Sequence, residues 1–150
     1  MQQGRDALLA HYRSMRAGLL AAVDGLNDAQ LGEASLDGWA VKDHLIHIAL
    51  WDEIRAAELQ RISAGFESLW KMSHEHESAF SPIGYELRRA ATAAQALWEL
   101  SQTHEALLAA ISAATPRGLD ASLYGEAGLP SSHETMHAFW IQRWRAERGF

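Results

Sequence analysis

Apolar residues recur at three- and four-residue steps along almost the whole chain, which is the pattern of amphipathic helices. The first such stripe consists of Leu8, Tyr12, Met15, Leu19, Ala22 and Leu26. β-Branched residues, which favour strands, are scarce between the stripes. Because an amphipathic helix must bury its apolar face against another element, we predict an all-α fold with several helices around a common core.

Four long helices are expected from this pattern, with one short helical turn at residues 29–33 and a connection at residues 65–80. They cover residues 4–25, 40–63 and 82–113, and a last segment that begins at Ser131 or Ser132. Pro82 suits a helix start, and Ser131 with Glu134 has the spacing of a capping box. The predicted architecture is a four-helix bundle, formed as a single domain by residues 1–150.

Composition excludes several classes of protein. The formal net charge is −6 and the basic residues form no stripe, which argues against nucleic-acid binding. No apolar run approaches the roughly 20 residues of a membrane span, and the N-terminal segment lacks a signal-peptide core. The chain has no cysteine, so any metal site must use His, Asp or Glu. We expect a cytoplasmic protein without membrane contact.

Two histidines of the last helix, His133 and His137, are one turn apart. Chance alone supplies roughly 0.4 such pairs in a chain of this composition, so the spacing by itself is weak. However, the pair shares a stripe about 60° wide with Trp140 and Trp144, and buried imidazoles need hydrogen bonds or a metal. The segment therefore indicates two ligands of a metal site, and a neighbouring helix must supply the third.

The second helix offers two candidates for that ligand, His44 and His47, which lie about 60° apart on the helix. His44 is nearer the centre of the apolar stripe that contains Val41 and Ile48, whereas His47 shares its side with Trp51. Periodicity does not choose between the two histidines.

The run from Gly38 to Asp52, GWAVKDHLIHIALWD, resembles the second-helix signature of the DinB/YfiT-like superfamily. The final segment resembles the second mark of that family, an H-x-x-x-H followed by apolar and aromatic residues. The resemblance implies a four-helix bundle whose metal-binding residues are His47, His133 and His137, with His44 at a variable position. It also implies a divalent transition metal such as zinc, nickel or iron. The family often has Ser or Thr where this chain has Ala40, so Asp37, a shifted helix start or water must cap that helix.

The same resemblance implies a class of function. Superfamily members include thiol-dependent transferases and isomerases, and a chain without cysteine must take its sulfur from a low-molecular-weight thiol. A metal-dependent hydrolase would use the same ligands. A third alternative is a non-catalytic binding or resistance protein of the ClbS/DfsB-like branch, which residues 120–125 resemble. The expected partner is a small-molecule substrate, and a homodimer through an exposed helix face is a further expectation.

Other polar and aromatic residues receive simpler interpretations. His74 and His76 are interpreted as polar surface in a connection, and His11 and His104 as surface or hydrogen-bonded core. Acidic residues of the second helix could orient an imidazole as hydrogen-bond acceptors; these are Asp43, Asp52, Glu53 and Glu58. Five of the six tryptophans are expected mainly in the core; these are Trp39, Trp51, Trp98, Trp140 and Trp144.

Overall fold

The computed structural model describes residues 2–35, 37–71, 73–125 and 128–150, and within these ranges it contains helices but no named strand. The elements are α1 (Gln2–Val23), α2 (Asp28–Leu31), α3 (Val41–Ser63), α4 (His74–Arg88), α5 (Ala93–Ala113), the 3-10 helix η1 (Ala121–Leu123) and α6 (His133–Arg148). No helix in these ranges has the length and apolar character needed to cross a membrane. The predicted all-α fold is confirmed.

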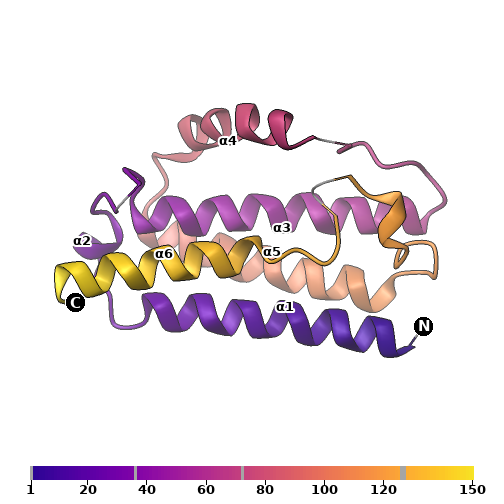
Figure 1. Ribbon diagram of the computed structural model, residues 1–150, viewed down its shortest axis with the longest axis horizontal. Helices are drawn as coiled ribbons and strands as arrows, with labels where there is room; N and C mark the ends of the chain where they lie inside the picture. Colours follow the sequence, from indigo (N-terminus) through magenta and orange to yellow (C-terminus); the bar gives the residue numbers. More distant parts are fainter. Residues whose placement is uncertain (1, 36, 72, 126–127) are drawn as a thin grey trace.

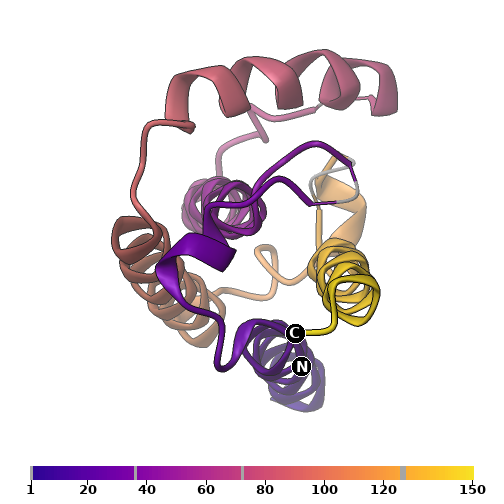
Figure 2. The same ribbon diagram turned by 90° about the vertical axis from the view of Figure 1, so that its left-hand side faces the viewer.

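Four of these helices form the bundle. Seen from one end, α1, α3, α5 and α6 surround a common centre, and α4 lies outside them (Figure 2). The closest pairs are α3 with α5 and α1 with α6. In Figure 1, α3 and α5 run in the same direction, because the chain returns along α4 between them, and α1 and α6 run in the opposite direction. The predicted four-helix bundle is confirmed, and its order is not a simple up-and-down sequence.

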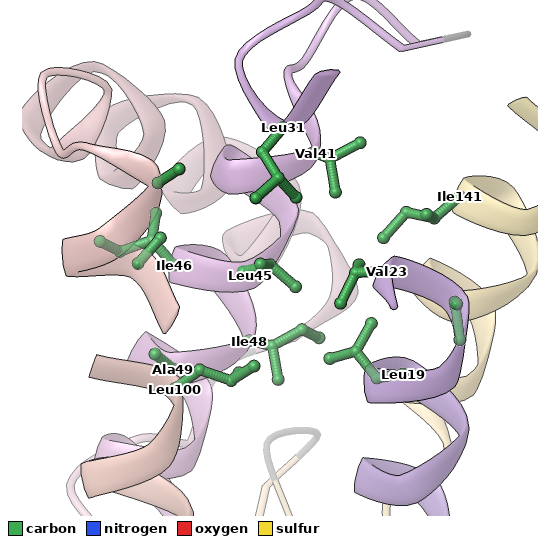
Figure 3. Close-up of a cluster of buried hydrophobic side chains, with 14 of the residues drawn as sticks. Leu19, Val23, Leu31, Val41, Leu45, Ile46, Ile48, Ala49, Leu100 and Ile141 are labelled. Atoms are coloured by element: carbon green, nitrogen blue, oxygen red, sulfur yellow. The ribbon is translucent and has the colours of Figure 1, made fainter. Parts of the chain in front are cut away.

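The core between the four helices is apolar and closely packed. Leu19 of α1, Leu45 and Ile48 of α3, Leu100 of α5 and Ile141 of α6 are almost completely buried and lie close together (Figure 3). Burying such a side chain contributes roughly 1.5–3 kcal/mol. This packing fixes α3 and α6, the two helices that carry the histidines of interest.

The predicted third helix, residues 82–113, is wrong, because the structure divides this region into α4 and α5. A cap starts each helix: Ser73 Oγ accepts a hydrogen bond from the His76 N–H, and Thr92 Oγ1 accepts one from the Gln95 N–H at 3.1 Å. Side-chain caps of this kind satisfy backbone N–H groups that lack a partner in the first turn. Pro82 consequently lies inside α4, and part of the predicted connection at residues 65–80 is helical.

Helix α4 covers one face of α3 without joining the bundle. None of its residues is fully buried. Its contacts with α3 include Phe80, which packs on Trp51, and its Tyr85 stacks on Trp39 with ring centroids 5.0 Å apart. Helix α4 therefore forms a lightly attached cover next to the start of α3, where Trp39 and His47 are in contact.

Candidate metal centre

Three histidines from two helices converge between α3 and α6. His47 comes from α3, and His133 and His137 come from the first turns of α6. His133 Nε2 lies 3.2 Å from His47 Nε2 and 3.0 Å from His137 Nε2. Two nitrogens bound to one ion at about 2.0–2.1 Å, with an angle of 90–110° between them, are about 2.9–3.4 Å apart. The structure thus brings together the three residues singled out in the sequence with spacings that fit one metal ion; metal binding itself stays a prediction.

The three imidazoles are held in their neutral form. Burial lowers the pKa of His47 to about 3 and that of His133 to about 4, with a smaller contribution from neighbouring cationic groups. Burial and the adjacent imidazoles also hold the pKa of His137 far below its usual value. A histidine must be neutral to bind a metal, so this cluster does not have to lose protons at neutral pH.

His44 lies outside the cluster, on the side of the His137 ring that is turned away from His133. It is completely buried, and its Nδ1 is 2.7 Å from Nδ1 of His137, the nitrogen of that ring that does not face His133. The other nitrogen of His44, Nε2, lies 3.1 Å from Asp37 Oδ1. Of the two histidines between which periodicity cannot choose, His47 meets the pair on α6 and His44 contacts one member of that pair from outside.

Aromatic rings flank the cluster. Trp39 contacts the edge of His47 at 5.2 Å between centroids, and Trp140 contacts His137 at 5.0 Å. Trp51 and Trp144 are buried as expected, but Trp98 is 59% exposed and Trp140 is 37% exposed. The expectation that the tryptophans lie mainly in the core is therefore wrong for these two.

No carboxylate lies within hydrogen-bond distance of His47, His133 or His137 in the described ranges of the chain. The acidic residues of α3 that were expected to orient an imidazole have other partners. Asp43 accepts a hydrogen bond from the Ala40 N–H and so caps α3. The other three form ion pairs or hydrogen bonds elsewhere: Asp52 with Arg16, Glu53 with Arg88, and Glu58 with Arg61 and Ser68. The carboxylate that does reach a histidine is Asp37, in the loop before α3. The sequence offers Asp37 only as a candidate cap of this helix; the structure gives that role to Asp43 and places Asp37 against His44.

Arg16 of α1 joins the two helices that carry the histidines. Its Nε donates to Glu134 Oε1 of α6 at 2.6 Å and its Nη2 to Asp52 Oδ2 of α3 at 2.5 Å, while Nη1 donates to the Leu100 carbonyl. Burial raises the pKa of both carboxyl groups, and the guanidinium opposes that rise. The predicted capping box is wrong, because Glu134 binds Arg16 and Ser131 Oγ accepts from the His133 N–H.

The remaining histidines lie outside the cluster. His74 and His76 are exposed in the first turn of α4, which agrees with a role as polar surface but not with a connection. His11 donates from Nε2 to the Ser131 carbonyl at 2.9 Å. Within the described residues, the buried Nδ1 of His104 has no hydrogen-bond partner.

The lowered pKa values predict how stability depends on pH in the metal-free protein. Unfolding returns each histidine to a pKa near 6.5, so the unfolded chain takes up protons that the folded chain refuses, and stability falls as the pH drops below that value. For each of His47 and His133 we expect a loss of about 1–2 kcal/mol between pH 7 and pH 5. Urea unfolding at both pH values measures this loss.

His47→Gln and His133→Gln should show a smaller pH dependence than the wild type, because glutamine does not titrate. The exposed His74 supplies the matched control, and His74→Gln should behave as the wild type. Equal pH dependence in all four proteins would contradict this assignment of neutral, buried imidazoles.

Comparison with known families adds an independent finding. A model of the DinB superfamily matches residues 11–143, a range that reaches from α1 into α6 and includes His47, His133 and His137. No curated protein and no solved structure matches the chain significantly. The narrower resemblance of residues 120–125 to the ClbS/DfsB-like branch stays a prediction. The family match covers most of the chain and includes α3 and α5 and most of α1 and α6, and the chain therefore belongs to the DinB superfamily.

Proposed function

We propose that the protein is a metal-dependent enzyme that acts on a reactive small molecule with the help of a low-molecular-weight thiol. It is either a transferase, which joins the thiol to the substrate through sulfur, or an isomerase, which uses the thiol and releases it again. The observation that carries this proposal is the convergence of three neutral imidazoles between aromatic rings, with no carboxylate of the described residues in hydrogen-bond contact with them. When bound, a divalent metal with three protein ligands supplies open coordination positions in which the pKa of a thiol or a water is lowered.

The surroundings favour a thiol over water as the nucleophile. The segment from His133 to His137 has the H-E-x-x-H spacing, in which metallopeptidases use the glutamate as general base. Here that glutamate, Glu134, is buried and bonded to Arg16, so it is not available to take a proton from water. A free thiol has a pKa of about 8.5 against about 15.7 for water, and a metal ionises it without a base.

A cavity next to the cluster supports a small substrate. It measures about 350 Å³ and is lined by Ser35, Asp37, Trp140 and Arg143. Trp140 also packs on His137, and Asp37 is bonded to His44, so the cavity adjoins the cluster from the side of His44. This volume suits a small organic molecule, and the Arg143 guanidinium offers a charge for an anionic group.

In this proposal the residues have separate tasks. His47, His133 and His137 would hold the ion, and Trp39 and Trp140 pack against the rings of His47 and His137. The thiol gives its proton to solvent and its sulfur forms a bond with an electrophilic carbon of the substrate. The π bond or carbon–oxygen bond of that carbon breaks at the same time, and the atom that receives the electron pair takes up a proton from solvent. In an isomerisation the same carbon–sulfur bond breaks again after the substrate has rearranged, and the thiol is released unchanged.

The test is turnover with defined probes. Protein loaded with zinc, nickel or iron(II) is mixed with glutathione or cysteine and with an activated alkene, an epoxide or a quinone. We expect many turnovers per chain that require both the metal and the thiol. The same rate should persist in His76→Gln, which alters an exposed histidine, and disappear in His137→Gln.

Two other results would contradict this proposal. Hydrolysis of esters or amides by the metal-loaded protein without any thiol would indicate a hydrolase. Uptake of the electrophile that saturates at one molecule per chain, with no turnover, would indicate a binding or resistance protein.

A further inference from the structure

A chain of close contacts runs from a surface carboxylate to the centre of the cluster. Asp37 Oδ1 lies 3.1 Å from His44 Nε2, and His44 Nδ1 lies 2.7 Å from His137 Nδ1. On the far side of its ring, His137 Nε2 lies 3.0 Å from His133 Nε2. Both nitrogens of His44 are thus engaged, and both nitrogens of His137 have a close neighbour.

The placement of protons along this chain follows from the chemistry of each group. An ionised carboxylate only accepts hydrogen bonds, so His44 Nε2 carries the proton that it donates to Asp37. When His44 is neutral, its Nδ1 carries a lone pair, and because two nitrogens 2.7 Å apart share one proton, His137 Nδ1 is then the donor. His137 Nε2 is left without a proton on the side that faces His133 and His47.

We propose that Asp37 and His44 are positioning residues that fix the tautomer and the ring orientation of His137 for metal binding. This inference rests on the proposed metal centre. Partners behind a ligating histidine commonly set its tautomer and raise its basicity. The usual arrangement is one carboxylate or carbonyl behind the ligand, whereas here a second, fully buried imidazole connects the ligand to the carboxylate.

The loop before α3 is built to hold Asp37 in place. Asp37 Oδ1 also accepts hydrogen bonds from the Ser35 hydroxyl at 2.6 Å and the Trp39 N–H at 3.2 Å. Gly38 adopts φ = 88°, and the Ser35 N–H donates to the Trp39 carbonyl at 2.6 Å, so the turn closes on itself. Burial raises the pKa of Asp37, but the hydrogen bonds from His44 and Ser35 outweigh burial and hold the pKa well below its usual range. The group therefore stays ionised at neutral pH.

His137 differs from its neighbour on α6 in this respect. Within the described residues, Nδ1 of His133 is buried and has no hydrogen-bond partner. Protein groups therefore fix the proton of His137 but not that of His133. We call the hydrogen-bonded chain from Asp37 through His44 to His137 the relay. Its loss should weaken metal binding by releasing the ring of His137.

Zinc affinity, measured by competition with a chromophoric chelator, tests the relay. His44→Leu removes the acceptor, and we expect zinc to bind about 10- to 100-fold more weakly. His44→Asn is the matched variant, because its Oδ1 takes a place similar to Nδ1 and still accepts from His137; it should recover most of the loss. Asp37→Ala should weaken binding in the wild type but add nothing in His44→Leu. Zinc affinity in His44→Leu within about two-fold of the wild type would overturn the proposal.

A second measurement separates this inference from the metal site itself. Nitrogen-15 NMR of the metal-free protein reports which ring nitrogen carries the proton. We expect His137 protonated at Nδ1 and His44 at Nε2, with a mixture of His137 tautomers in His44→Leu. A His137 proton at Nε2 in the wild type contradicts the relay whether or not metal binds. Failure of the wild type to bind zinc, nickel or iron(II), with the expected tautomers present, would count against the metal centre alone.

Discussion

Arg16→Met is expected to lower the free energy of unfolding by about 3–5 kcal/mol, the usual cost of removing one partner from a buried ion pair. The side chains of Arg16, Asp52 and Glu134 are all at most 5% exposed. Without the guanidinium, two carboxylates remain in the interior with Arg55 as their nearest cation, 3.9 Å from Asp52. The Leu100 carbonyl also loses its hydrogen bond from Arg16.

Urea unfolding of the metal-free protein measures this loss. Arg89→Met is the matched control: Arg89 pairs with Glu86 at the surface, both about 60% exposed, and such pairs contribute about 0–1 kcal/mol. Arg16→Lys should fall between the two, because it keeps the charge but cannot bind both carboxylates with a planar fork. If Arg16→Met were as stable as Arg89→Met, the network would not hold α3 and α6 together.

The second large effect concerns the histidines themselves. A structural zinc site with four ligands provides about 10–16 kcal/mol, or roughly 2.5–4 kcal/mol per ligand. His137→Ala should therefore weaken zinc binding roughly a hundred- to a thousand-fold, and His47→Ala and His133→Ala should do the same. At a zinc concentration about a hundred times the dissociation constant of the wild type, zinc should stabilise the wild type by about 2.7 kcal/mol in a thermal melt. The same concentration is at or below the dissociation constant of the variants, so zinc should stabilise them by less than about 0.5 kcal/mol.

His76→Ala controls for loss of an exposed imidazole and should bind zinc as the wild type does. The comparison of His44→Ala with His47→Ala is the sharpest one. If His44→Ala abolished binding while His47→Ala retained it, the ligand set would be wrong. Less than about a tenth of an equivalent of transition metal in the wild type after reloading would end the metal hypothesis altogether.

The helices could largely be predicted, because each depends on its own periodicity. α1, α3 and α6 begin or end within about two residues of the predicted bounds. The sequence predicts one helix over residues 82–113, which contain the second half of α4 and all of α5, and residues 89–92 between them contain neither proline nor glycine. The signal for a new helix was present nevertheless: Thr92 followed by Gln95 has the spacing of a helix N-terminus, and Thr92 caps α5.

The site could be predicted only in part, for a physical reason. Spacing identified His133 and His137, since both lie on one helix, and resemblance to a family chose His47. The roles of Arg16 and Asp37 depend on contacts between elements that are far apart in the sequence or in a loop. Glu134 shows the limit clearly: its spacing from Ser131 predicts a local cap, but its partner is the buried Arg16 of α1.

The start of α6 at His133 has an electrical consequence for the centre. The N-terminus of a helix carries a partial positive charge, equivalent to about half an elementary charge in a long helix. Glu134, the acidic residue of this first turn, is paired with Arg16, and no carboxylate of the described residues is in hydrogen-bond contact with the three rings, so a divalent ion held by them would keep most of its positive charge. The centre would therefore act as an anion receptor, most selective for compounds that become negative when they bind, as a thiol does when it gives up its proton.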